Sequence, residues 1–228
     1  MNKRINIYLS NNYDADYLEV TIYSIVLNTK TPVSIYYNFQ KPISDWLSKY
    51  AQKQNHKIYR VRNPTDIQCD DKIIQLSAMC LVMDDLSDLY NVQVTSENPV
   101  ATSYQLFANS EEEKQNLRPM VYPAVFLNKS YLSKLQDIIN KSISVSYLHP
   151  KYCVTSDKRI LLPQLMTNPS NLKYEEILSV VAKPSIIRFP KAYDVTEPKQ
   201  IYVDTWLTYY AALKSSRYYI KWVNTSSV

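Results

Sequence analysis

The first part of the chain switches repeatedly between the hydrophobic period of a strand and that of a helix. Ile5, Ile7 and Leu9 alternate with polar residues, as in a strand, and the apolar positions that follow recur at helical spacing. The predicted elements are strands over 5–9, 33–39 and 57–61 and helices over 18–26 and 43–51. This alternation predicts an α/β fold with a mostly parallel sheet and helices on both faces.

The ends of these strands also predict where a ligand binds. In open α/β sheets, ligands bind beyond the carboxyl ends of the strands. The site is therefore expected past Leu9, Val61 and Leu76, the last of which closes a short buried strand over 73–76.

The rest of the chain is less regular. We expect an extended segment over 80–83, a one-turn helix over 85–90, strands near 99–105, 121–127 and 185–189, and helices from 130, near 174–181 and over 202–213. A polar helix is predicted between the first two of those strands, where Ser110 and Glu113 fit a capping box. No repeat or linker divides the chain, so a single domain over 1–213 is expected, followed by a tail over 214–228.

Composition excludes one large class of sites. The chain has 228 residues and no glycine, although average usage would give roughly 16. Phosphate-binding and dinucleotide-binding loops need glycine for positive φ angles and for close approach of the backbone to phosphate. We therefore expect neither kind of loop.

Charge and cysteine content favour a protein of a reducing compartment with no nucleic-acid partner. The net charge of +5 is modest, and we expect it to be spread along the chain rather than gathered in a block, the C-terminus excepted. Cys69, Cys80 and Cys153 are too few and too far apart for a disulfide framework or a zinc site. No apolar window is long enough to span a membrane and no secretory segment follows the start, so a cytoplasmic location is expected.

The titratable residues suggest no hydrolytic centre. His56 and His149 have no nucleophile or acidic partner at an informative spacing, and both are expected at the surface. Asp85 is expected to cap the short helix after it rather than to form a metal pair with Asp84.

Three stretches resemble one known enzyme family. Residues 17–25, with residues 11–13 before them and 28–29 after, resemble the start of family 8 glycosyltransferases, whose pattern is D-D-N-Y, Y-L-x-V-[ST]-I-x-S-[IL] and N-[TS]. Residues 72–90 overlay without gaps on the family's K-x-[IV]-Y-L-D-A-D-x-[LIV]-[LIV]-x-x-D-[LI]-x-[ED]-L-[WY]. Residues 186–189 lie where the family has I-I-H-[YF]. The resemblance implies a GT-A fold, an α/β sandwich that binds a nucleotide-sugar.

The residues that would carry the family's chemistry depart from its pattern. The resemblance implies that two D-x-D carboxylates and the later His hold Mn²⁺, whose charge stabilises the departing diphosphate. Here the D-x-D positions are Ser77 and Met79, and the His position is Arg188. Mn²⁺ is therefore not expected as a cofactor, and Met79 is expected to fill a gap in the core. The candidate donor-site residues are Asn11, Asn12, Tyr13, Ser77, Arg188 and Lys191.

Two functions are compatible with these departures. The first is a catalytically degenerate homologue, a pseudo-glycosyltransferase that binds a protein partner or a glycan or nucleotide; another glycosyltransferase or a second copy of this chain is the expected partner. The alternative is an active, retaining, metal-independent hexosyltransferase of polysaccharide or lipopolysaccharide synthesis, in which Arg188 and nearby lysines replace Mn²⁺. A glycan-binding module that uses exposed Tyr and Trp is a third interpretation.

The C-terminal segment 214–222 interleaves three cations with three aromatic residues. The residues expected to make a membrane or partner contact are Arg217, Tyr218, Tyr219, Lys221 and Trp222. Such side chains suit an anionic bilayer interface. The alternative is a helix that packs its aromatic residues on its own domain.

Overall fold

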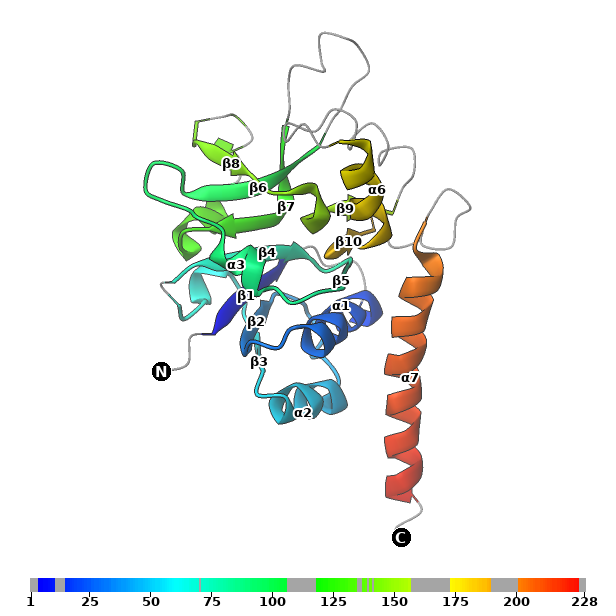
Figure 1. The fold of residues 1–228 in the computed structure, drawn as a ribbon. Coiled ribbons are helices and arrows are strands. Elements are labelled where there is room, and N and C mark those ends of the chain that lie inside the picture. The colour runs from blue at the N-terminus through cyan, green and yellow to red at the C-terminus, as the bar shows by residue number, and fades with distance from the viewer. Residues whose placement is uncertain are drawn as a thin grey trace.

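A seven-stranded sheet in the order β3-β2-β1-β4-β7-β6-β8 forms the centre of the molecule (Figure 1). The computed structural model describes residues 4–10, 15–69, 71–105, 118–134, 137–138, 140, 142–156, 173–189 and 201–225. The strands are β1 (Ile5–Ser10), β2 (Val33–Tyr37), β3 (Lys57–Arg60), β4 (Ile73–Ser77), β6 (Val100–Gln105), β7 (Arg118–Phe126) and β8 (Val145–Tyr147). β7 runs against its neighbours and the other six strands share one direction, so the predicted α/β fold with a mostly parallel sheet is confirmed.

A second, three-stranded sheet begins just beyond the carboxyl end of β4. It consists of β5 (Cys80–Val82), β10 (Ile186–Arg188) and β9 (Val154–Thr155), with β10 in the middle. β10 is antiparallel to β5 and parallel to β9, so residues distant in sequence meet at the end of the large sheet.

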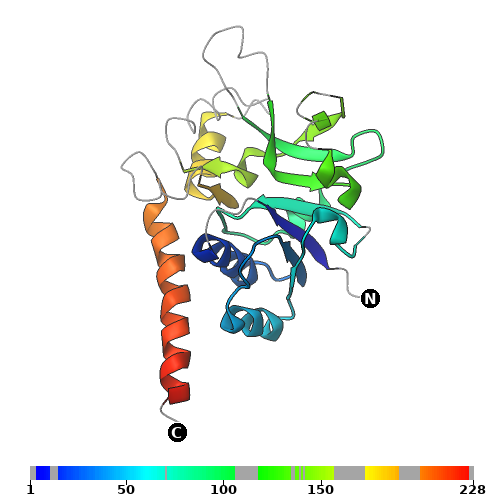
Figure 2. The same cartoon turned by 180° about the vertical axis from the view of Figure 1, so that it is seen from behind.

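Helices cover the large sheet unequally. α1 (Ala15–Asn28) and α2 (Asp45–Lys53) lie together on one face, and the short α3 (Ser87–Asn91) follows β5 (Figure 1). α6 (Tyr174–Ala182) lies near the small sheet. α7 (Val203–Thr225) passes beside α1, and its C-terminal end lies away from the sheet in both views (Figure 2).

The two faces of the sheet bury different side chains, because successive residues of a strand point to opposite sides. Ile7 and Leu9 pack against α1 and α2 on one face, and Tyr8 and Tyr36 belong to the cluster on the other face. Strands buried on both faces read as nearly continuous apolar runs. This arrangement explains why β1, β2 and β4 are so rich in Ile, Leu and Tyr.

Two of the described residues adopt the left-handed conformation that glycine usually takes. They are Asn55, with φ of 61°, and Tyr202, with φ of 63°. Asn tolerates this region, whereas a bulky side chain is strained there. Tyr202 is held by its hydroxyl, which donates a 2.6 Å hydrogen bond to the carbonyl of Val181, and by its position immediately before α7.

Some local predictions differ from the structure. The helix predicted from residue 130 begins as a 3₁₀ helix over Lys129–Ser133, where the Asn128 side chain accepts hydrogen bonds from the Ser130 amide and hydroxyl, and residues 137–138 are α-helical as predicted. α7 continues past residue 213 to Thr225, and β9 was not predicted. The predicted polar helix with Ser110 and Glu113 lies outside the described residues.

His56 contradicts the expectation of a surface residue. Its side chain is only 4% exposed, and its Nδ1 accepts a 3.1 Å hydrogen bond from the backbone N–H of Val33. Burial, and secondarily the positive charge of Arg4, lowers the pKa of the His56 imidazole. His56 therefore joins the end of α2 to β2 as a neutral side chain. His149 is exposed, as expected.

Candidate functional site

The segment Ser77-Ala78-Met79 lies at the carboxyl edge of the sheet, where the site was expected. Ser77 ends β4 and pairs with Ser10 at the end of β1. The backbone N–H of Ala78 donates a 3.0 Å hydrogen bond to the carbonyl of Ser10. The turn that holds the D-x-D positions therefore continues the ladder between the two central strands.

Met79 faces the protein interior. Its side chain is 2% exposed and belongs to an apolar cluster with Val20 of α1, Phe189 and Trp206 of α7. Its carbonyl accepts a 3.0 Å hydrogen bond from the N–H of Phe189. The expectation that Met79 fills a gap in the core is confirmed.

Ser77 belongs to a small polar row across β1 and β4. Its hydroxyl accepts a 3.2 Å hydrogen bond from the N–H of Met79. The side-chain amide of Gln75 donates to the hydroxyl of Ser10 at 3.3 Å, while its buried Oε1 has no hydrogen-bond partner among the described residues. The sequence interpretation missed Gln75, although it stands where the family pattern has Tyr, and this mismatch was a signal that could have found it.

Arg188 approaches the same edge from the small sheet. β10 places it opposite Cys80 of β5, and the backbone N–H of Ser156 donates to its carbonyl at 2.8 Å. A hollow of about 10 Å³ separates these elements, with a lining of Leu76, Ser77, Cys80, Pro123, Ile186 and Arg188. The structure therefore brings Ser77 and Arg188, but not the Met79 side chain, to one hollow.

The Arg188 guanidinium is half-buried and has no hydrogen-bond or ion-pair partner within the part of the chain that the structure describes. A guanidinium presents planar donors that match the oxygens of a phosphate or diphosphate. Among the described residues, Arg188 therefore has no ion pair to break before it meets an anion at this edge.

Cys80 is not a nucleophile in this setting. Burial, with Cys153 acting in the same direction, raises the pKa of the Cys80 thiol to about 12, although the charge of Arg188 opposes the shift. Because the thiolate is the reactive form, Cys80 remains an inert thiol at neutral pH.

Polar side chains of α1 form hydrogen bonds with the backbone of this turn and of the strand that follows it. Thr21 hydrogen-bonds the backbone of Ala78 and Cys80, and the Ser24 hydroxyl accepts from the N–H of Val82 at 3.0 Å. The Asn28 side chain donates to the carbonyl of Val82 at 2.8 Å. These three residues belong to the stretches that resemble family 8, so those stretches support the strand after the D-x-D positions.

The acidic residues that follow have a structural role, as expected. The Asp85 carboxylate accepts hydrogen bonds of 2.7 Å from the backbone N–H of Ser87, where α3 begins, and from that of Lys30. Asp84 accepts from the Asp85 N–H at 2.8 Å. No group of three or more His, Cys, Asp or Glu residues in the described ranges is placed to hold a metal ion.

The described donors at this edge do not fit Mn²⁺. They are the Ser77 hydroxyl and the Arg188 guanidinium, with the Met79 thioether turned into the core. Mn²⁺ prefers carboxylate, carbonyl and water oxygens. No step of a reaction is therefore assigned to a metal here.

Four of the candidate donor-site residues, Asn11, Asn12, Tyr13 and Lys191, lie outside the described residues. The backbone of the five candidate tail residues from Arg217 to Trp222 lies in α7, and their side chains are outside the described part. None of the helices in the described ranges has the length and apolar character needed to cross a bilayer.

Comparison with solved structures identifies the fold. The glycosyltransferase GlyE of Streptococcus pneumoniae TIGR4 superimposes with a TM-score of 0.64 at 15% identity, over 91% of this chain and 61% of GlyE. The bifunctional glycosyltransferase WbbM gives a TM-score of 0.66 at 16% identity, over 92% of this chain and 50% of WbbM. The galactosyltransferase LgtC, in complex with donor and acceptor sugar analogues, gives 0.63 at 13% identity, over 91% of this chain and 96% of LgtC.

The chain has a GT-A-type glycosyltransferase fold. It spans only half to two thirds of the length of WbbM and GlyE but nearly all of LgtC. No family model and no curated protein matches the sequence. At such low identity, likeness of structure establishes the fold alone.

Proposed function

We propose that this protein is a degenerate homologue of family 8 glycosyltransferases, which has lost metal-dependent sugar transfer and acts by binding. The burial of Met79 in the apolar cluster beneath α7 carries the proposal. A carboxylate at this position would lose its hydration among Val20, Phe189 and Trp206. The side chain at position 79 can therefore pack in the apolar cluster or ligate a metal ion, but it cannot do both.

Family 8 ancestry is supported by two kinds of observation. The pattern over 72–90 matches the family except at Gln75 and at the two D-x-D positions, Ser77 and Met79, and the fold is of the GT-A type. Thr21, Ser24 and Asn28 supply a physical reason for the pattern, because their hydrogen bonds hold β5. A protein that acts by binding needs the residues that support its fold, but it does not need the metal-ligating residues. We propose a protein partner, either another glycosyltransferase or a second copy of the chain.

The decisive experiment is calorimetric titration of the purified protein with a panel of nucleotide-sugars, with and without Mn²⁺, together with an assay of donor hydrolysis. We expect no turnover and no dependence of the heat on Mn²⁺. Transfer or hydrolysis that requires Mn²⁺ would overturn the proposal. Donor binding without turnover would identify a nucleotide-sugar, rather than a protein, as the retained ligand.

A second candidate is an active, metal-independent transferase, and the guanidinium of Arg188, which has no ion pair among the described residues, favours it. Arg188 borders the same hollow as Ser77 at the edge where GT-A folds bind their donors. A fixed cation at that place stabilises the charge that develops on a leaving diphosphate.

Substitution of Arg188 distinguishes this candidate from the first. Transfer that survives a chelator but is abolished in Arg188→Ala and reduced in Arg188→Lys would establish it, because lysine keeps the charge and loses the bidentate geometry. Lys134→Ala is the matched control, since Lys134 is an exposed cation after the 3₁₀ helix. Activity unchanged in Arg188→Ala would eliminate the mechanism.

A further inference from the structure

The excess of positive over negative charge lies in one segment, contrary to the expectation that it is spread along the chain. Residues 41–62 contain six lysines and arginines and one acidic residue, which leaves 20 of each sign in the rest of the chain. The net charge of +5 thus resides in α2, β3 and their flanks. We name these cations the basic β3 edge: Lys41, Lys49, Lys53, Lys57, Arg60 and Arg62.

All six side chains of the basic β3 edge are exposed, and none has an ion-pair or hydrogen-bond partner in the ranges that the structure describes. Asp45, at the start of α2, is the acidic residue among them. A cluster of unpaired cations creates a positive potential that attracts an anionic partner.

β3 is also the terminal strand of the sheet, and it pairs with β2 alone among the described strands. The N–H of Val61 donates to the carbonyl of Tyr37 at 2.9 Å, so Lys57 and Tyr59, which alternate with Val61, also direct their backbone groups to β2. The backbone N–H and C=O groups of Ile58 and Arg60 consequently point away from the sheet. A terminal strand of this kind accepts a further strand.

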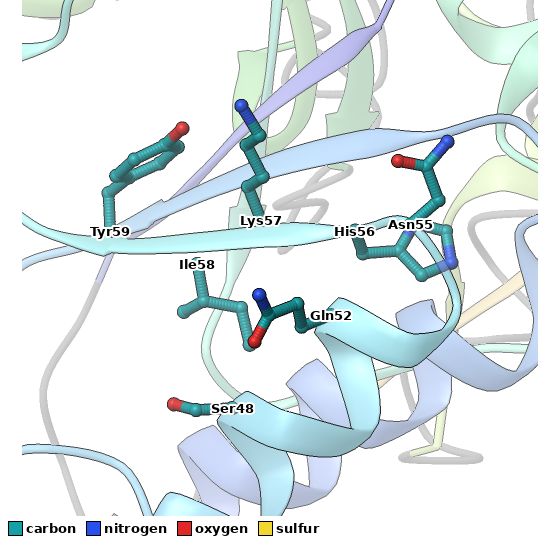
Figure 3. Close-up of a pocket in the computed structure, with 7 residues that line it drawn as sticks. All are labelled: Ser48, Gln52, Asn55, His56, Lys57, Ile58 and Tyr59. Atoms are coloured by element: carbon teal, nitrogen blue, oxygen red, sulfur yellow. The ribbon is translucent and has the colours of Figure 1, made fainter.

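An open hollow of about 450 Å³ lies between strand β3 and helix α2 (Figure 3). Ser48 and Gln52 of α2 line it together with Ile58, while Lys57 and Tyr59 point to the other side of the strand. Tyr59 is 40% exposed and stacks on Tyr36 with ring centroids 5.2 Å apart. An added strand would therefore find room on the α2 side for one set of alternate side chains, and Lys57 beside the other set.

We propose that the basic β3 edge binds an extended acidic segment of a partner protein, which adds to the sheet as a strand next to β3. A second copy of this chain does not fit the same edge. Pairing of two copies through β3 would bring the six cations of one basic β3 edge against the same six of the other copy, and like charges across an interface repel each other. The proposal goes beyond the function proposed above and holds whether or not the donor edge binds a sugar nucleotide.

The test uses a short, capped, fluorescent peptide that alternates Glu and Val, titrated into the intact protein at low ionic strength and followed by anisotropy. A second peptide has the same sequence with alternate backbone nitrogens methylated, so it keeps the charge and loses strand donors. We expect the methylated peptide to bind at least about tenfold more weakly, a difference of about 1.4 kcal/mol. Equal binding of both peptides, or of a charge-matched oligonucleotide or acidic polysaccharide, would overturn the proposal in favour of a general anion surface.

Two charge reversals locate the surface. Lys57→Glu combined with Arg60→Glu is expected to abolish peptide binding, whereas Lys173→Glu combined with Lys183→Glu is expected to leave it unchanged. The control lysines are exposed, flank α6 and lie far from β3 (Figure 1). Equal loss in both double variants would contradict the proposal, and thermal unfolding confirms that each variant is folded.

Amide exchange gives a readout that does not depend on charge. On binding of the Glu-Val peptide, the N–H groups of Ile58 and Arg60 are expected to gain protection, while those of Lys57 and Tyr59 stay as they are. Binding without protection at Ile58 and Arg60 would show that no strand is added and would overturn the proposal.

Discussion

The hydroxyl of Thr21 lies 2.8 Å from the backbone carbonyl of Ala78, the middle residue of the segment Ser77-Ala78-Met79. It lies equally close to the carbonyl of Cys80 and accepts a 3.3 Å hydrogen bond from the N–H of that residue. One buried side chain of α1 thus serves three backbone groups on both sides of the turn. The conformation of this turn is therefore held by α1.

Replacing Thr21 should therefore loosen the turn. Thr21→Val keeps the shape of the side chain and leaves buried backbone groups of Ala78 and Cys80 without a partner. We expect a loss of about 1–3 kcal/mol in the free energy of unfolding, measured by urea denaturation. Thr208→Val, at an exposed position of α7, should change stability by less than about 0.5 kcal/mol. Equal effects of the two changes would show that the turn does not depend on Thr21.

Placing a carboxylate at position 79 should harm the fold rather than create a metal site. Met79→Asp places a charge among Val20, Phe189 and Trp206, and we expect a loss of at least about 3 kcal/mol. Met79→Leu, which keeps volume and polarity, should cost less than about 1.5 kcal/mol. Thermal unfolding with and without Mn²⁺ measures both effects. A Met79→Asp variant that is as stable as the parent and is stabilised by Mn²⁺ would contradict the role assigned to Met79.

Stability should fall in mildly acidic solution because His56 is buried as the neutral imidazole. Its pKa in the folded state is lowered by burial and by Arg4, whereas in the unfolded chain it is about 6.5. The unfolded state therefore binds the proton more readily, and the free energy of unfolding decreases as the pH falls below about 6.5. The pKa of His149 is also lowered, by burial and by Lys151, so this residue contributes to the same decrease of the free energy of unfolding with falling pH.

Substitution separates the two histidines. His56→Asn should reduce the decrease of stability between neutral and mildly acidic pH, and His149→Asn should reduce it less, since that residue is exposed. Urea denaturation at several pH values provides the measurement. A pH dependence that is unaltered in His56→Asn would show that His56 is not the group responsible.

The part of α7 from Arg217 to Trp222 is our candidate for a membrane or partner contact. Deletion from Tyr218 onward should abolish flotation with anionic liposomes and leave thermal unfolding unchanged, because Trp206 and Leu213 remain in their cluster. Deletion of residues 226–228 alone is the control. Unchanged flotation would remove the membrane from consideration, and a marked loss of stability would show that the aromatic residues pack on the domain itself.

The opening of the fold could be predicted from the sequence because its signals are local and repeated. Ile7 and Leu9 in β1, and the apolar stripe of α2 that ends with Ala51, face one core, so their spacing reports their environment directly. His56 could not be placed in the same way. It follows polar residues in a turn, and only the pairing of β2 with β3 brings the Val33 amide to its ring.

The candidate site was predictable in place but not in detail. Parallel topology alone locates Ser77 beside Ser10 at the carboxyl edge. The neighbours of Met79 come from α1, β10 and α7, which are distant in sequence, so no spacing could show that its side chain points inward. The concentration of charge in residues 41–62 was available from the sequence and became meaningful once β3 proved to be a terminal strand.

The anchoring of α7 has a mechanical consequence. Trp206 and Leu213 fix one end of the helix in the cluster that contains Met79, and the Tyr209 hydroxyl accepts a 2.7 Å hydrogen bond from Asn28. Beyond Leu213 the same helix continues to Thr225, an arm of about 18 Å at 1.5 Å per residue. A load at the outer end therefore acts on the packing of Trp206 and Leu213, which share their cluster with Met79.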